Sequence, residues 1–105
     1  MILFLGASLK AQTEKEAIIN ENGTIALPED QPVSEMYAFD IASLEFTDLG
    51  EAVNYFSDLN SEYFVFRPNI ADNKAYLFVQ KAKEPDYTAA EWNNHLSEIL
   101  IFPNQ

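Results

Sequence analysis

Hydrophobic and polar residues alternate along the middle of the chain with the period of β-strands. Residues 36–41 alternate in this way, and residues 63–67 and 75–80 form two further strands that are rich in aromatic residues. The polar segment 68–73 joins the last two strands and has the composition of a hairpin turn, with one proline and two asparagines. The pattern therefore predicts three strands, of which the second and third form a hairpin.

Two other segments carry apolar residues at steps of three and four, which is the spacing of one helical face. In residues 48–60 this stripe consists of Leu49, Ala52, Val53, Phe56 and Leu59. In residues 88–99 it consists of Trp92, Leu96 and Ile99. Asp48 with Glu51, and Thr88 with Glu91, have the spacing of capping boxes, so we expect a helix to begin at each pair.

The first third of the chain predicts a targeting segment and a small hairpin. Residues 1–12 contain an apolar run and then small residues, which indicates the remnant of a secretory signal peptide; the alternative is a short buried strand. Residues 13–32 read as a hairpin with a type I′ turn at Asn22-Gly23, followed by a linker that holds Pro28 and Pro32. We expect residues 33–105 to form the main domain and the protein to be bacterial, and either periplasmic or secreted.

The order strand, helix, hairpin, helix predicts a ferredoxin-like α+β fold, βαββα(β), with an antiparallel sheet that carries both helices on one face. The chain resembles heavy-metal-associated domains over about residues 35–100. Residues 36–66 and 74–79 fall where that family has its first three strands, and residues 42–46 where it places its metal-binding loop. The family binds soft metals through two cysteines, and this chain has none, so the resemblance implies a fold and no metal chemistry.

Composition and charge limit the classes of function. The 105 residues suit one globular domain, with 48% hydrophobic and 13% aromatic residues. The net charge of −11 disfavours binding to nucleic acids or anionic membranes and favours a basic partner or a cation. Residues 13–62 hold twelve of the seventeen acidic residues and one base, Lys15, so the negative charge is concentrated in the first half of the chain.

The best metal candidate is a calcium loop at the N-terminal hairpin. Asn20, Asn22 and Glu29 keep part of the spacing of an EF-hand loop around Gly23. Position 1 of such a loop would be Ile18, which has no ligand atom in its side chain, so a plain hairpin turn is favoured. The same turn contains a glycosylation sequon, Asn22-Gly23-Thr24. We expect no cofactor and no metal.

Two single residues are candidates for chemistry. His95 is the only histidine and lies on the flank of the second helical stripe, where it either shields the edge of the core or acts as an acid or base. No serine elbow or glycine-rich phosphate loop accompanies it, so we expect no enzyme. Arg67 is the only arginine, and its planar fork suits either an internal carboxylate or that of a ligand.

The aromatic residues give the main functional hypothesis. They occupy both alternation classes of their strands, so we expect aromatic side chains on the face of the sheet that the helices leave open: Tyr37, Phe39, Tyr63, Tyr76 and Phe78. The hairpin, a second copy of the chain, or an outside partner would cover this face. We therefore expect a non-catalytic binding domain that contacts an unknown protein or itself. A calcium-stabilised module, and a small enzyme using His95, are the alternatives.

Overall fold

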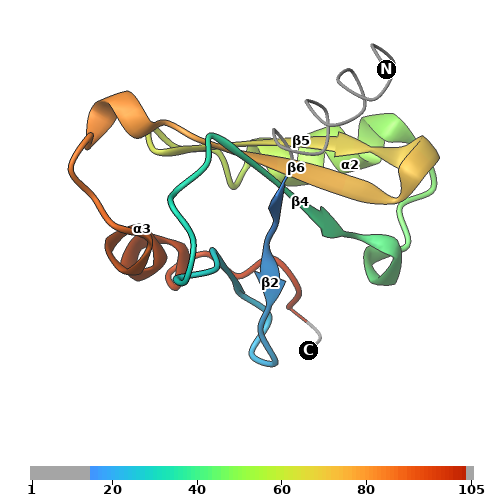
Figure 1. Ribbon diagram of the computed structural model, residues 1–105. Helices are drawn as coiled ribbons and strands as arrows, with labels where there is room; N and C mark the ends of the chain where they lie inside the picture. The colour runs from blue at the N-terminus through green and yellow to red at the C-terminus, as the bar shows by residue number, and fades with distance from the viewer. Residues whose placement is uncertain (1–14, 104–105) are drawn as a thin grey trace, which may run out of the picture.

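The protein has an α+β fold in two layers, a four-stranded mixed sheet and a layer of helices with a small hairpin (Figure 1). The computed structural model describes residues 15–103. The sheet has the order β1-β4-β6-β5, with β1 (Lys15–Glu16), β4 (Met36–Asp40), β6 (Lys74–Val79) and β5 (Phe64–Asn69). The other elements are the hairpin of β2 (Ile18–Ile19) and β3 (Ile25–Ala26), the helices α2 (Leu49–Ser57) and α3 (Ala89–Leu96), and the 3-10 turns η1 (Ala42–Leu44), η2 (Ile70–Asp72) and η3 (Lys81–Lys83).

The three predicted strands and two predicted helices are present, but the edge of the sheet differs from the expectation. β4 and β5 each pair with β6 in antiparallel orientation. The place beside β4 belongs to β1, which runs parallel to it, and no strand forms in residues 99–102. The structure therefore has an α+β fold with a mixed sheet, and it does not confirm the ferredoxin-like order of elements.

One face of the sheet forms the core. Tyr37 lies opposite Leu77, and Leu77 lies opposite Phe66, so these side chains share a face and are 3% exposed or less. Both helices pack on this face, since Phe56 of α2 stacks on Phe66 at 5.9 Å and Trp92 of α3 contacts Phe64 at 5.7 Å. Burial of this apolar surface is the main driving force for folding.

Two of the residues expected on the open face lie in the core instead. Tyr37 and Phe39 are 1% and 4% exposed, because the two-residue period of β4 points both toward the helices. The same period on β6 buries Ala75, Leu77 and Val79 in the core and turns Tyr76 and Phe78 to the second face, where both are partly buried.

Tyr63 precedes β5 and does not belong to the second face. Its ring lies 5.9 Å from the Trp92 ring and 4.7 Å from the His95 ring, so it covers the edge of the core beside α3. The placement of Tyr63 on an open sheet face was therefore wrong, since the strand begins one residue later.

The N-terminal hairpin lies on the same side of the sheet as α3 (Figure 1), and its apolar residues share one core with both helices. Ile25 and Leu27 are each 1% exposed and belong to the same hydrophobic core as the sheet and helices. The Asn93 side chain on α3 accepts a hydrogen bond from Leu27 N at 2.7 Å and donates one to Leu27 O at 3.1 Å. The hairpin therefore completes the core, and of the three possible covers of the second face this one is wrong.

The turn of this hairpin has three residues rather than the two of a type I′ turn. Gly23 N donates to Asn20 O, Asn20 N donates to Thr24 O, and Gly23 has a φ of 92°. These features are those of a type I turn followed by a left-handed glycine. Asn22 keeps a negative φ and accepts hydrogen bonds from Thr24 N and Thr24 Oγ1.

Side-chain caps start both helices, as the sequence predicts. Thr88 and Glu91 form a complete capping box on α3. On α2, Asp48 accepts from Glu51 N, while the Glu51 carboxylate accepts from Thr47 N rather than from the Asp48 backbone. The predicted stripe of α2 is only partly buried.

Within residues 15–103, no helix is both long and apolar enough to cross a membrane. The expected signal-peptide remnant, residues 1–12, lies outside the described residues.

Replacing Gly23 by alanine should destabilise the protein by about 2–4 kcal/mol. The φ of 92° is unfavourable for alanine, and the added methyl would overlap the backbone carbonyl of Phe102. Urea unfolding measures the change. Gly50→Ala is the matched control, because Gly50 lies in α2 with ordinary contact distances, so that alanine should be neutral or stabilising by up to about 1 kcal/mol. Equal effects of the two substitutions would contradict the assigned turn.

Replacing Asn93 by alanine should lower the free energy of unfolding by about 1–3 kcal/mol, because the Leu27 amide loses its partner in a part-buried site. Asn94→Ala is the control on the same helix, since Asn94 is exposed and the described residues give its side chain no hydrogen bond. Thermal or urea unfolding of the two variants compares them. A loss at Asn94 as large as that at Asn93 would show that helix propensity, not the hairpin contact, sets the effect.

Candidate functional site

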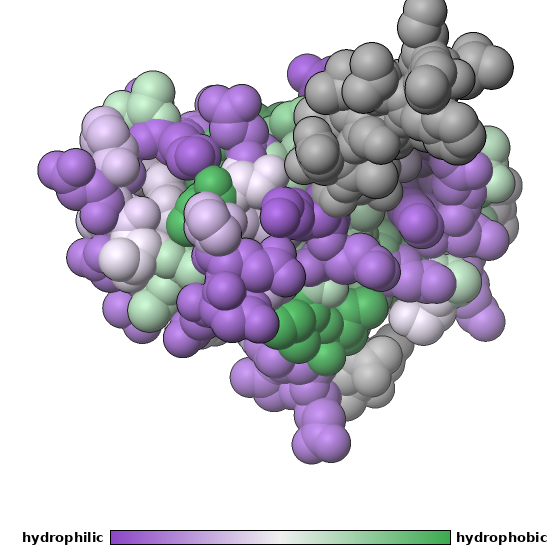
Figure 2. Space-filling model, in the orientation of Figure 1, coloured by the Kyte–Doolittle hydropathy of each residue, from purple (hydrophilic) through white to green (hydrophobic). Residues whose placement is uncertain are grey.

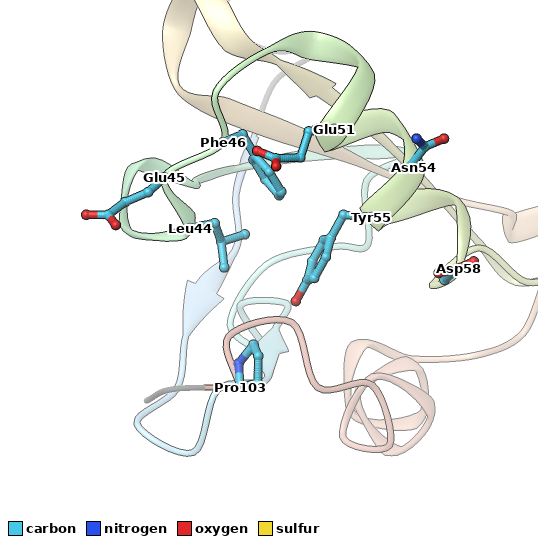
Figure 3. Close-up of a pocket in the computed structure, with 8 residues that line it drawn as sticks. All are labelled: Leu44, Glu45, Phe46, Glu51, Asn54, Tyr55, Asp58 and Pro103. Carbon is cyan, nitrogen blue, oxygen red and sulfur yellow. The ribbon is translucent and has the colours of Figure 1, made fainter.

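A groove beside α2 is the candidate site, and we call it the acidic groove. It has a volume of about 550 Å³. Its lining, shown in Figure 3, combines an apolar floor with acidic and amide side chains and contains no basic residue: Leu44, Glu45, Phe46, Glu51, Asn54, Tyr55, Asp58 and Pro103.

Local backbone geometry places the first wall of the acidic groove. The Asp40 carboxylate accepts a hydrogen bond from Ala42 N at 2.7 Å, which starts the turn η1. Glu45 follows in the left-handed region with a φ of 54°, and this reverses the chain toward α2. Phe46 then packs its ring 5.4 Å from the Tyr55 ring and 5.9 Å from the Phe56 ring.

Helix α2 supplies the second wall from one of its faces. Glu51, Asn54, Tyr55 and Asp58 are spaced at three and four residues, so they lie along one side of the helix.

The third wall is the C-terminal segment. Tyr55 Oη donates a hydrogen bond of 2.6 Å to Ile101 O, which holds that segment and places Pro103 opposite the helix.

The groove has the chemistry of a site for cationic, partly apolar groups. Figure 3 shows Leu44, Phe46 and Tyr55 pointing toward its centre, whereas Glu45 and Asn54 point away and form the rim with Asp58. Aromatic rings attract cations, and carboxylates add charge and hydrogen-bond acceptors. The Glu51 carboxylate is already bonded to Thr47, so Glu45 and Asp58 are the acidic groups that the described contacts leave for a ligand.

The groove is not among the sites that the sequence predicts. The helical spacing of Glu51, Asn54, Tyr55 and Asp58 was the available signal, because it sets a polar and acidic face beside the apolar stripe. The contribution of Pro103 has no such signal, since it depends on a contact across more than forty residues.

The structure does not assemble the residues proposed for calcium. The Asn22 side-chain oxygen accepts hydrogen bonds from Thr24, and the Glu29 carboxylate accepts one from Asn93 at 3.0 Å. Asn20 donates its side-chain amide to Thr24 Oγ1. Across residues 15–103, no three histidine or acidic side chains are grouped to hold a metal ion.

His95 lies among aromatic rings rather than beside a carboxylate. Its ring stacks on Tyr87 at 5.6 Å and lies 4.7 Å from the Tyr63 ring. Its hydrogen-bond partner is the Tyr87 hydroxyl, with 3.4 Å between Nε2 and Oη. The ring therefore closes the edge of the core beside α3, and the described contacts give it no acidic partner for proton transfer.

Arg67 has no carboxylate within ion-pair distance among residues 15–103, contrary to the internal ion pair that the sequence favoured. Its guanidinium lies over the Phe78 ring, 5.9 Å from the centroid. It belongs to the second face of the sheet, together with Tyr76 and Val65.

A third exposed feature lies on the hairpin. Figure 2 shows an apolar patch over β2, where Ile18 and Ile19 are 49% and 43% exposed. Both side chains are aliphatic and carry no charge and no hydrogen-bonding group, so the patch does not indicate a type of partner.

Comparison of the chain with models of known protein families, with curated proteins and with solved structures gave no match. Any inference about function therefore depends on the acidic groove and on the surface around Arg67.

Stability should fall as the pH rises above about 10, because buried tyrosines resist ionisation. Burial raises the pKa of Tyr37 above its ordinary value of 10.0, although the hydrogen bond from Ser34 N lowers it in part. Burial likewise raises the pKa of Tyr55. Unfolded chains lose these protons first, so the stabilisation is complete below pH 10 and is lost as the pH rises through the folded-state pKa values.

Urea unfolding between pH 8 and 11 measures this slope. Tyr37→Phe and Tyr55→Phe should each make it shallower, since each removes one of the shifted groups, and the Tyr55 variant also loses the bond to Ile101. An unchanged slope in both variants would contradict the assignment.

Proposed function

We propose that this protein is a small exported, non-catalytic binding domain whose acidic groove holds a basic, partly apolar segment of a partner protein. The observation that carries the proposal is the charge of the groove: three carboxylates and no base line an aromatic floor. The net charge of −11, concentrated in the half of the chain that contains the groove, supports it, because such a field attracts a basic partner and speeds its association.

The shape of the groove supports a peptide segment rather than a small substrate. Its floor is formed by Leu44, Phe46 and Tyr55, and the groove lies open at the surface between α2 and the C-terminal segment. Such a floor takes a leucine-sized or aromatic side chain, while Glu45 and Asp58 on the rim reach lysine or arginine residues beside it. Export remains part of the proposal on the basis of the apolar N-terminal run alone.

We extend the proposal to the fold class. In the order β4-β6-β5, the strands β4 and β5 flank β6, which comes last of the three in the chain, and both helices pack on one face, as in a ferredoxin-like split β-α-β unit. The parallel strand β1 occupies the edge where that fold has its last strand. The proposed relation to heavy-metal-associated domains is thus one of element order, without their metal site.

A direct test uses two labelled peptides of equal length, one alternating leucine with lysine and the other alternating leucine with glutamate. Fluorescence anisotropy should show binding of the leucine–lysine peptide and none of the leucine–glutamate peptide. The double variant Glu45→Lys, Asp58→Lys should weaken the binding about tenfold or more, which corresponds to about 1.4 kcal/mol.

The matched control is the double variant Glu62→Lys, Glu98→Lys, which makes the same change of net charge at exposed positions outside the groove. It should lower the affinity much less. Equal losses in the two double variants would show that the overall field binds the peptide, and the groove would then not be the site.

A further inference from the structure

A second surface of opposite charge lies around Arg67, and we call it the Arg67 surface. Three adjoining hollows of about 420, 440 and 400 Å³ all share Arg67 in their linings. None of the three linings contains an aspartate or glutamate, in a chain with seventeen of them. The main apolar residues around Arg67 are Leu49, Val53, Val65, Pro68 and Tyr76.

The groups of this surface are accessible. Leu49 and Val53 are 52% and 43% exposed, which is high for large apolar side chains of a helix. Arg67 is exposed, and no carboxylate among residues 15–103 pairs with it. A guanidinium that lies over a ring keeps its N–H groups free for a bidentate bond to a carboxylate. The surface therefore suits an apolar contact with an acidic group at its centre.

The edge of the sheet beside this surface does not accept another strand. Phe66 N donates to Asn60 Oδ1 at 2.7 Å, and Phe64 O accepts from Ser61 N at 2.9 Å. Pro68 has no backbone N–H to offer. Since the outer edge of β5 is blocked in this way, a partner must contact the surface through side chains.

The acidic groove has the complementary chemistry. It combines carboxylates and no base with an apolar floor, whereas the Arg67 surface combines one arginine and no acid with apolar side chains. The two lie on roughly opposite sides of α2, because Glu51, Tyr55 and Asp58 are about half a turn away from Leu49, Val53 and Ser57. A single chain therefore cannot bring its own two surfaces together.

We propose that the protein associates with itself head to tail, with the Arg67 surface of one copy docked in the acidic groove of the next. Arg67 bonds a carboxylate on the rim, where Glu45 and Asp58 lie at opposite ends of the groove, while Leu49, Val53 and Pro68 contact the apolar floor. The contact joins two different surfaces, so a dimer still has a free groove at one end and a free Arg67 surface at the other. Further copies can therefore add, and the assembly grows as the concentration rises. This inference rests on the acidic groove that the proposed function also uses, so a basic partner would compete with the next copy for it.

Static light scattering of the full chain across a concentration series tests this association. At 0.15 M salt the repulsion between two acidic copies is screened beyond roughly 8 Å, so it does not hide a short-range contact. The mass of the unaltered protein should rise with concentration above the 11.9 kDa of one chain. Arg67→Glu alone, and Glu45→Lys with Asp58→Lys alone, should each stay monomeric.

An equimolar mixture of these two variants is the decisive sample. One variant keeps its groove and the other keeps its Arg67 surface, and the two reversed surfaces are also complementary in charge, so the mixture should associate although each variant alone does not. This outcome also shows that both variants are folded. Lys83→Glu, and the pair Glu62→Lys with Glu98→Lys, are charge-matched controls at exposed positions and should associate like the unaltered protein.

Three outcomes would overturn the proposal: an unaltered protein that is monomeric at all concentrations, association that survives both variants, or a mixture that remains monomeric. The leucine–lysine peptide separates this failure from that of the proposed function. Arg67→Glu leaves the groove intact and should bind the peptide with unchanged affinity. Peptide binding by a monomeric protein would retain the proposed function and reject self-association, and self-association without peptide binding would do the reverse.

Discussion

The backbone carbonyl of Gly23 is the point on which the layer beneath the sheet depends. It accepts hydrogen bonds from both Ile101 N and Phe102 N at 2.9 Å, so the tip of the hairpin holds the end of the chain. Phe102 then places its ring 6.2 Å from that of Phe39 in the core, and Ile101 O accepts the hydroxyl of Tyr55. One left-handed glycine thus connects hairpin, sheet and helix, and it fixes the segment that forms a wall of the acidic groove.

The same constraint explains why the sheet ends in β1 rather than in a strand from the C-terminus. Ile99 N is still bonded to Leu96 O at the end of α3, and Ile101 N is already bonded to Gly23 O. A single residue lies between these two bonds, which is too short a connection to reach the edge of β4. The N-terminal segment reaches that edge directly, since Lys15 and Glu16 pair with β4 and Ala17 N donates to Ala38 O.

The sequence predicted the elements well and their mutual placement poorly, for a physical reason. Caps and periodicity are local, so Thr88 with Glu91 and the alternation of β6 could be read directly. The burial of Tyr37 depends on its being opposite Leu77, and the side on which Leu27 packs depends on Asn93, and both are long-range pairings. The acidic groove was missed for the same reason, although the polar face of α2 was visible in the sequence.

Helix α2 separates the acidic groove from the Arg67 surface, because its nine residues face three different environments. Ala52 and Phe56 are fully buried in the core, Tyr55 and its acidic neighbours line the groove, and Leu49 and Val53 face the Arg67 surface. Ala52 and Phe56 are the buried residues of α2, so the hydrogen bonds that Asp48 and Glu51 accept at its N-terminus add to its stability. The groove and the Arg67 surface lie on roughly opposite sides of this one helix, so the contact that we propose at one of them does not obstruct the other.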